Sequence, residues 1–275
     1  MVLVIIAVIT AGILFLAVKP ISEGFSSQVT KDTCRASIVA RGIELKGISV
    51  GQIFGSSLKC ETEKKCISMG GTCPKNYEVI TVSNENAIKK ELANSMADCW
   101  SMVGEGEINF FGKNALETKN CIFCSVIHFD ENVQKKYPQI NGLTDYILNN
   151  QVPGMSKTYF DYMFTASAQK DVKPVTIDTS QDYSVNFAMV KGGYLWGILG
   201  KTAIVGGVLY VIGTGGFGAI PVLVGITKYG AVAGAAYIGM GMAKQTSVAD
   251  VMLAINPYTP ESIKEQECNN IESIP

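Results

Sequence analysis

Cysteine is the residue type in this chain with the most obvious capacity for chemistry, and two cysteines have a suggestive spacing. Cys121 and Cys124 form the C-x-x-C pattern of redox and metal sites. A redox pair needs its thiols at a helix N-terminus, but the apolar residues of Cys121–Phe129 indicate a strand buried on both faces. Side chains alternate along a strand, so these two cysteines should point to opposite faces. We therefore expect each to form a structural disulfide with a different, distant cysteine.

The full set of cysteines favours an oxidising compartment. The chain holds eight, all of them after an N-terminal apolar segment: Cys34, Cys60, Cys66, Cys73, Cys99, Cys121, Cys124 and Cys268. An even number on one side of a membrane suits complete pairing, which predicts four disulfides and no free thiol. The turn sequence Ser68–Gly71 would place Cys66 opposite Cys73, so these two are the expected first pair.

Other possible catalytic or binding motifs are weak. The only histidine, His128, lies on the same apolar strand as the C-x-x-C pair and is expected to be a hydrogen-bonded structural residue. Gly213–Gly218 matches G-x-G-x-x-G, but no short strand precedes it and no acidic residue follows within about 20 positions. We therefore expect no catalytic, cofactor-binding or metal-binding residue and no cofactor, and we do not predict an enzyme.

The elements that position the cysteines begin with an apolar segment. Val2–Val18 contains no charged residue and ends at Lys19 and Pro20, so residues 1–21 are predicted to be an N-terminal transmembrane anchor helix. A cleaved signal peptide is the alternative, although no basic residue precedes the segment. A pilin-like helix packed inside a filament is a second alternative. Ile5 occupies the position at which many processed pilins have an acidic residue.

Residues 22–190 are predicted to form an extracytoplasmic, cysteine-rich domain of mixed α and β structure. Expected strands are Leu58–Thr62, Tyr77–Val82, Cys121–Phe129, Val175–Asp178 and Tyr183–Val190, and expected helices are 83–103, Leu143–Asn150 and Lys157–Phe164. The helix at 83–103 should begin with Ser83 as its N-cap and end at Gly104. Its buried face should carry Ile88, Leu92, Met96, Cys99 and Val103, with Cys99 linked to the sheet. Trp100 lies beside this face and could rim it, but core packing is the expected role of both Cys99 and Trp100.

Fifteen of the 28 glycines fall in the next region, residues 191–243. Two apolar stretches there predict a transmembrane helical hairpin, with close helix packing at Gly193, Gly197, Gly230 and Gly234. A hairpin buried in a soluble or filament core is the alternative. Lys201 and Lys228 have no acidic residue nearby in sequence, so each should face a wet interior, a partner or lipid headgroups. Residues 244–275 are expected to be an acidic tail.

Three local strings carry a resemblance to other proteins. They are Cys34–Ser37, Met96–Trp100 continuing to Gly104–Gly106, and Cys121–Ser125. Together they resemble uncharacterised membrane-anchored, cysteine-containing surface proteins of small-genome archaea, over about residues 1–190. The resemblance implies topology and disulfides; it implies no activity.

The formal net charge of −1 and the absence of long basic runs argue against nucleic acid as a partner. The sequence as a whole predicts an α+β protein at the cell membrane with its main domain outside the cytoplasm. Its expected role is that of a structural or interaction protein, as a subunit of a larger envelope or surface assembly. The expected partners are the lipid membrane and copies of itself or other surface proteins. A pilin-like filament subunit and an oligomeric membrane pore or transport component are the alternatives, and a membrane-tethered enzyme ranks below them.

Overall fold

The computed structural model describes residues 31–42, 58–106, 108, 120–163, 176–191, 211–212, 222–223, 249–266, 268 and 270–272. The helices in this part of the chain are residues 31–42, α3 Glu85–Met102, α4 Glu131–Lys136, α5 Leu143–Asn149, α6 Tyr159–Met163 and α8 Pro260–Glu265. None of these helices has both the length and the apolarity needed to cross a bilayer. The expected anchor at residues 1–21 lies outside the described residues.

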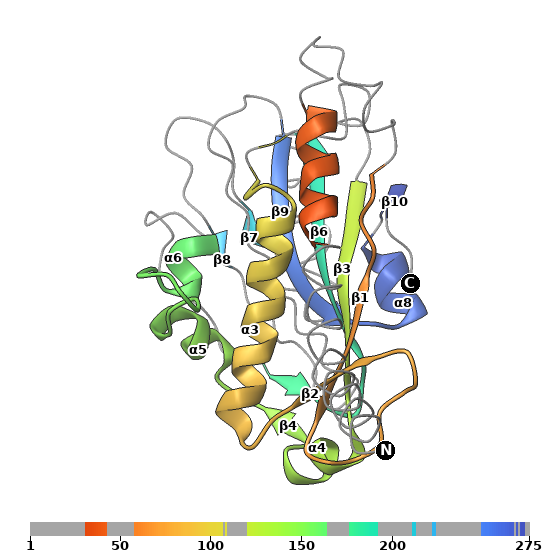
Figure 1. Cartoon of the computed structure of the whole chain (residues 1–275), viewed down its shortest axis with the longest axis vertical. Helices are drawn as coiled ribbons and strands as arrows, with labels where there is room; N and C mark the ends of the chain where they lie inside the picture. Colours follow the sequence, from red (N-terminus) through yellow and green to blue (C-terminus); the bar gives the residue numbers. More distant parts are fainter. Residues whose placement is uncertain are drawn as a thin grey trace, which may run out of the picture.

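A mixed sheet organises the fold (Figure 1). Its strands are β1 Glu63–Ser68, β2 Glu78–Thr81, β3 Asn120–Phe129, β6 Tyr183–Lys191, β9 Ala249–Pro257 and β10 Asn270–Glu272. The order is β2-β1-β3-β6-β9, and β10 pairs with the first residues of β3. Only the pairs that include β6 are antiparallel. The predicted mixed α+β class is confirmed.

The central strand, β3, is buried along almost its whole length, as its apolar sequence predicts. Residues 31–42 and α3 lie on the same face of the sheet (Figure 1). A register shift between Phe123 and Ser125 marks a β-bulge beside Cys124. Phe129 and Tyr183 then pack edge to face, in the core that α3 covers.

Helix α3 closely follows its sequence pattern. The side chain of Asn84 accepts a hydrogen bond from the Ala87 N–H at 2.9 Å, so Asn84, not Ser83, is the N-cap. All five residues of the expected apolar stripe are 0% exposed, and Gly104 follows the helix at a φ of 70°. Trp100 is also buried, which confirms the expected core packing, and its ring packs on Phe187 of β6.

All eight cysteines are paired. The disulfides are Cys34–Cys60, Cys66–Cys73, Cys99–Cys124 and Cys121–Cys268. Cys121 and Cys124 do bond to different distant cysteines, and Cys99 does link α3 to the sheet. The Cys66–Cys73 pair is also confirmed, but its expected geometry was wrong, because β1 and β2 are parallel and do not form a hairpin.

A single carboxylate holds the turn that follows β1. Asp130, at the N-terminus of α4, accepts hydrogen bonds through Oδ2 from the Ser68 hydroxyl and from the amides of Met69 and Gly71. Its Oδ1 accepts from the Val133 N–H at 2.7 Å and caps the helix. A side chain at Gly71 would meet the Asp130 carboxylate at 2.7 Å, so the turn needs glycine there.

The C-terminal segment is an integral part of the sheet. Residues 249–257, expected to belong to an acidic tail, form β9 and pair with β6 along its whole length. On the sheet face away from α3, the buried Asn256 Nδ2 donates to Asn186 Oδ1 at 3.0 Å. Asn186 Nδ2 in turn donates to Gln266 Oε1, just after α8. Asn186 therefore links the segment after β9 to the middle of the sheet.

Other boundaries also differ from expectation. Leu58–Thr62 is not a strand. β1 begins at Glu63, where pairing with Ser125 of β3 starts, and Glu63 forms an ion pair with Lys65 of the same strand. The small strands are β4 Gln139–Ile140 with β5 Ile177–Asp178, and β7 Val211–Ile212 with β8 Val222–Leu223. β7 and β8 are extended, so the helical hairpin is wrong at these four residues. The rest of 192–243 lies outside the described residues.

Candidate binding groove

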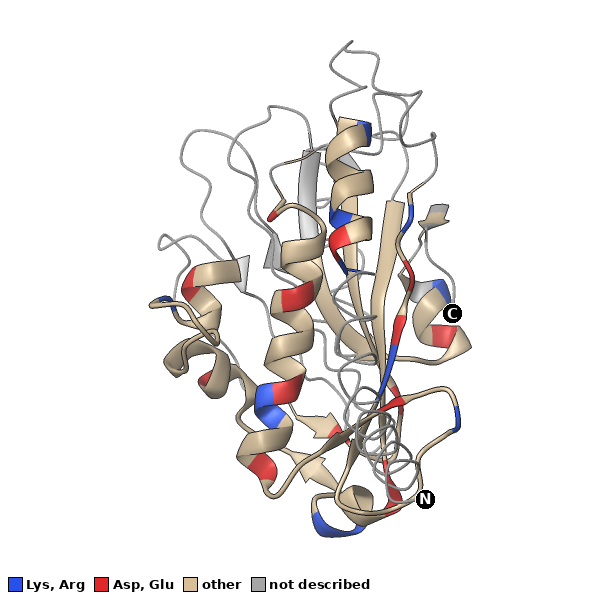
Figure 2. Ribbon diagram, in the orientation of Figure 1, with Lys and Arg blue, Asp and Glu red and all other residues tan. Residues whose placement is uncertain are grey.

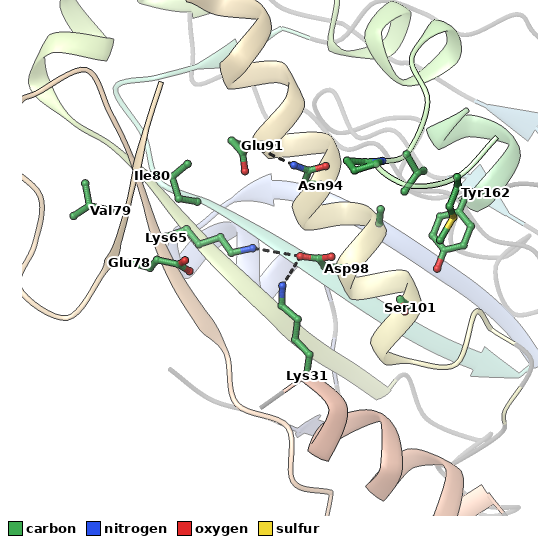
Figure 3. A pocket seen from close by; sticks show the side chains of 14 residues that line it. Lys31, Lys65, Glu78, Val79, Ile80, Glu91, Asn94, Asp98, Ser101 and Tyr162 are labelled. Atoms are coloured by element: carbon green, nitrogen blue, oxygen red, sulfur yellow. Dashed lines mark hydrogen bonds and ion pairs between the residues drawn. The ribbon is translucent and has the colours of Figure 1, made fainter. Parts of the chain in front are cut away.

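A groove with a volume of about 640 Å³ runs beside one stripe of α3 (Figure 3). The stripe consists of Glu91, Asn94, Ala97, Asp98 and Ser101. The other lining comes from Lys31, from Lys65 of β1, from residues 78–80 of β2 and from the segment between Val152 and Tyr162. In Figure 3, the β1–β2 side chains lie on one side of α3 and Tyr162 lies on the other.

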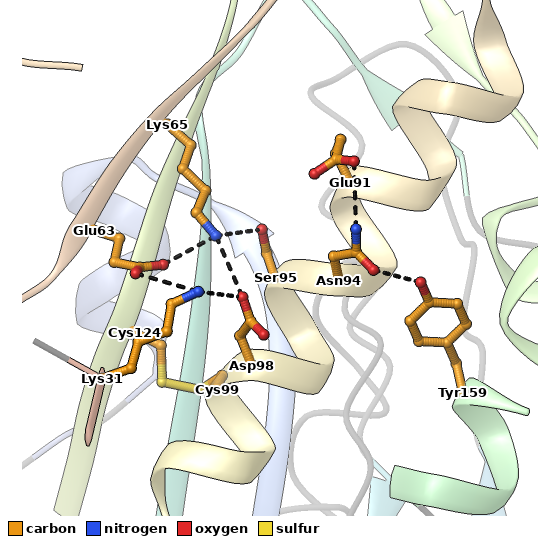
Figure 4. A network of polar contacts seen from close by, with 10 residues as sticks. All are labelled: Lys31, Glu63, Lys65, Glu91, Asn94, Ser95, Asp98, Cys99, Cys124 and Tyr159. Atoms are coloured by element: carbon orange, nitrogen blue, oxygen red, sulfur yellow. Dashed lines mark hydrogen bonds and ion pairs between the residues drawn. A yellow bond between two sulfur atoms is a disulfide. The ribbon is translucent and has the colours of Figure 1, made fainter. Parts of the chain in front are cut away.

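Two lysines and two carboxylates form an ion-pair network at the base of this groove (Figure 4). Lys31 Nζ lies 2.5 Å from Asp98 Oδ2 and 3.5 Å from Glu63 Oε1. Lys65 Nζ lies 2.9 Å from Glu63 Oε2 and 3.8 Å from Asp98 Oδ2, and donates to Ser95 Oγ. Burial opposes the charge on Lys31, but Asp98 and Glu63 outweigh it and raise the pKa of this lysine above its usual value.

The network is positioned by covalent and packing constraints. The Cys99–Cys124 disulfide lies next to Asp98 in sequence and holds this part of α3 on β3 (Figure 4). Lys65 occupies the same face of the sheet as the buried Ile67, two residues along β1. A buried lysine is costly unless it is paired and hydrogen-bonded, and here Glu63 and Ser95 supply both partners.

A second polar chain crosses the outer side of α3. Glu91 Oε1 accepts from Asn94 Nδ2 at 3.3 Å, and Asn94 Oδ1 accepts from the Tyr159 hydroxyl at 2.5 Å. Burial raises the pKa of Tyr159 well above its usual value, so this hydroxyl stays protonated and remains a donor. The chain links α6 to α3 and fixes the amide orientation of Asn94.

The charges of the groove do not cancel completely. Lys31 and Lys65 balance Asp98 and Glu63, whereas Glu78 and Glu91 have no ion-pair partner among the described residues. More widely, both signs of charge are interspersed along α3 and β1 in this view (Figure 2). The groove therefore contains an ion-pair network with no net charge. It also contains two carboxylates, Glu78 and Glu91, that have no ion-pair partner among the described residues.

The single histidine lies outside this groove. His128 Nδ1 lies 2.7 Å from Asp182 Oδ1, and its ring packs edge to face on Tyr77. The expectation that His128 is hydrogen-bonded is thus confirmed. Within the described ranges, no group of three or more His, Cys, Asp or Glu side chains is arranged to hold a metal ion.

The structure brings the predicted cysteines together but leaves other predictions untested. Lys201, Lys228, Gly193, Gly197, Gly230 and Gly234 all lie outside the described residues. Sequence reasoning did not single out the groove residues Lys31, Lys65, Glu91 and Asp98, nor Glu63, which pairs with the two lysines. One available signal was Lys65, whose alternation with Ile67 places a lysine on the buried face of a strand. A second was the charge at positions 91 and 98, opposite the apolar stripe of α3.

No protein-family model, no curated protein and no solved structure matches this chain.

Proposed function

We propose that this chain is a structural or interaction protein of the cell surface, held at the membrane, with its disulfide-containing domain outside the cytoplasm. The observation that carries the proposal is that four disulfides account for all eight cysteines. Disulfides of this kind form and persist in oxidising compartments and are rare where thiols are kept reduced.

The role in an assembly is supported by the groove beside α3. Its volume of about 640 Å³ and its two uncompensated carboxylates offer a recognition surface held by a disulfide beneath it. We propose that this groove contacts another surface protein, so that the chain acts as one subunit of a larger envelope structure.

The test uses the full chain in its native cells. Cells are lysed in excess alkylating reagent without reductant, and the protein is unfolded and analysed by mass spectrometry. If the proposal is correct, no cysteine will be alkylated and the chain will be recovered in the membrane fraction. Protease added to intact cells will digest its main domain. Alkylation of several cysteines together with full protease protection would contradict the extracytoplasmic location. Electron microscopy of the native material then distinguishes an assembly from isolated protomers.

A further inference from the structure

Among the strands that the structure describes, β2 lies at one end of the sheet and leaves one edge without a partner strand. Among the described strands it pairs with β1 alone, and its residues are mostly exposed, including Val79 at 55%. The Val82 N–H, directly after β2, donates to the Ser68 carbonyl at 2.9 Å. Successive residues of a strand direct their backbone groups to opposite edges, so Val79 and Thr81 direct theirs away from β1. An edge of this kind is a template for another strand.

The side chains beside that edge belong to the groove. Glu78 and Ile80 line it from β2, while Glu91 lines it from α3 (Figure 3). Glu78 and Glu91 have no counter-ion among the described residues. At the other end, the charges are of both signs, because Arg35 donates to Ser101 and Glu105 accepts from Tyr162. The excess negative charge is therefore concentrated next to the open strand.

We propose that the groove binds an extended basic segment of a partner protein, which adds to β2 as a further strand. Backbone hydrogen bonds to Val79 and Thr81 would hold the segment, and its lysine or arginine side chains would reach Glu78 and Glu91. Apolar side chains two residues along the segment from a lysine, and therefore on the same face, would meet Ile80 and Val152. This inference rests on the proposed role as an interaction protein and names the chemistry of the partner.

The test is a titration of the full-length protein in a non-ionic detergent with a fluorescein-labelled peptide of Lys-Thr-Val-Thr repeats, followed by fluorescence anisotropy. In an added strand this peptide presents lysine and valine in turn on one face. We expect saturable binding that weakens with added salt, and no binding of the matching peptide with glutamate in place of lysine. Changing Glu78→Gln and Glu91→Gln together should weaken binding by roughly up to fivefold for each carboxylate removed.

Strand addition has its own test at Val79. Val79→Pro removes an N–H that faces away from β1, so it should abolish binding while β2 stays paired. Val79→Ala keeps that N–H and should bind like the wild type, which makes it the matched control. Circular dichroism and the disulfide pattern of each variant show that the fold is intact.

Two results would overturn the inference. One is the absence of saturable binding of the basic peptide to a correctly disulfide-bonded protein. The other is binding that survives Val79→Pro, which would place the peptide on α3 and not on β2. Either result leaves the surface location standing, because location and redox state are measured separately in cells.

Discussion

The carboxylate of Asp130 is completely buried and accepts four hydrogen bonds, from Ser68, Met69, Gly71 and Val133. Burial alone would raise its pKa, but these hydrogen bonds outweigh burial and hold the pKa of Asp130 below the usual value. One side chain thus joins the turn after β1 to the start of α4. At this scale, the contacts depend on groups about 60 residues apart, which no local pattern in the sequence reveals.

Asp130→Asn should lower the free energy of unfolding at neutral pH by about 1–3 kcal/mol, because buried donors lose a charged acceptor. Denaturation by urea measures the change. The exposed Glu131, which accepts from the Thr72 N–H, provides the control, and Glu131→Gln should have a much smaller effect.

The pH dependence of stability follows from the same lowered pKa. In the wild type, the contribution of Asp130 is present above the ordinary carboxyl pKa of about 4 and is lost as the pH falls through the lower folded value. Asp130→Asn should therefore show a flatter loss of stability on acidification. Parallel pH curves for the two proteins would mean that the pKa of Asp130 is the same in the folded and unfolded states, which would contradict the lowered folded value.

At the scale of elements, the features that were predicted correctly are those with a regular local pattern of apolar residues. The apolar stripe of α3 and the two-sided burial of β3 are local, and both were predicted correctly. Strand direction is not local: Ser68–Gly71 resembles a hairpin turn, but β1 runs parallel to both β2 and β3. Strand β9 was missed because the acidic composition of 244–275 predicts a solvated tail, although Val251–Ile255 is a continuous apolar run of the kind found in buried strands.

The start of α3 allows a direct test at this scale. The sequence predicts Ser83 as the N-cap, whereas the structure has Asn84 in that position. Asn84→Ala removes the acceptor for the Ala87 N–H and should cost about 1 kcal/mol of stability. Ser83→Ala should leave stability almost unchanged. Thermal or urea denaturation of the two variants compares them directly, and a larger effect at Ser83 would contradict the observed cap.

At the scale of the whole molecule, the disulfides differ most in the length of chain they enclose. Cys66 and Cys73 are 7 residues apart, whereas Cys121 and Cys268 are 147 apart. Closing a longer loop removes more conformational entropy from the unfolded chain. The even number of cysteines predicts that all of them pair. It does not say which pairs form, because eight cysteines allow about 105 connectivities.

Replacing both cysteines of a pair by serine should therefore reveal a ranking. Loss of Cys121–Cys268 should cost roughly 5 kcal/mol, against roughly 2 kcal/mol for Cys66–Cys73, on the chain-entropy scale. Urea denaturation of the two double variants measures the difference. Equal costs would mean that the unfolded chain already holds residues 121 and 268 close together.

The late position of β9 has a consequence for biosynthesis. A ribosome that has just completed Lys191 has made β1, β2, β3 and β6, yet the partner strand of β6 and the bonding partner of Cys121 do not exist. Domains commonly fold from the N-terminus during synthesis, but this one must hold an incomplete sheet until translation reaches residues 249–268. An unpaired Cys121 thiol therefore marks a nascent or truncated chain, one in which β6 still lacks its partner strand β9.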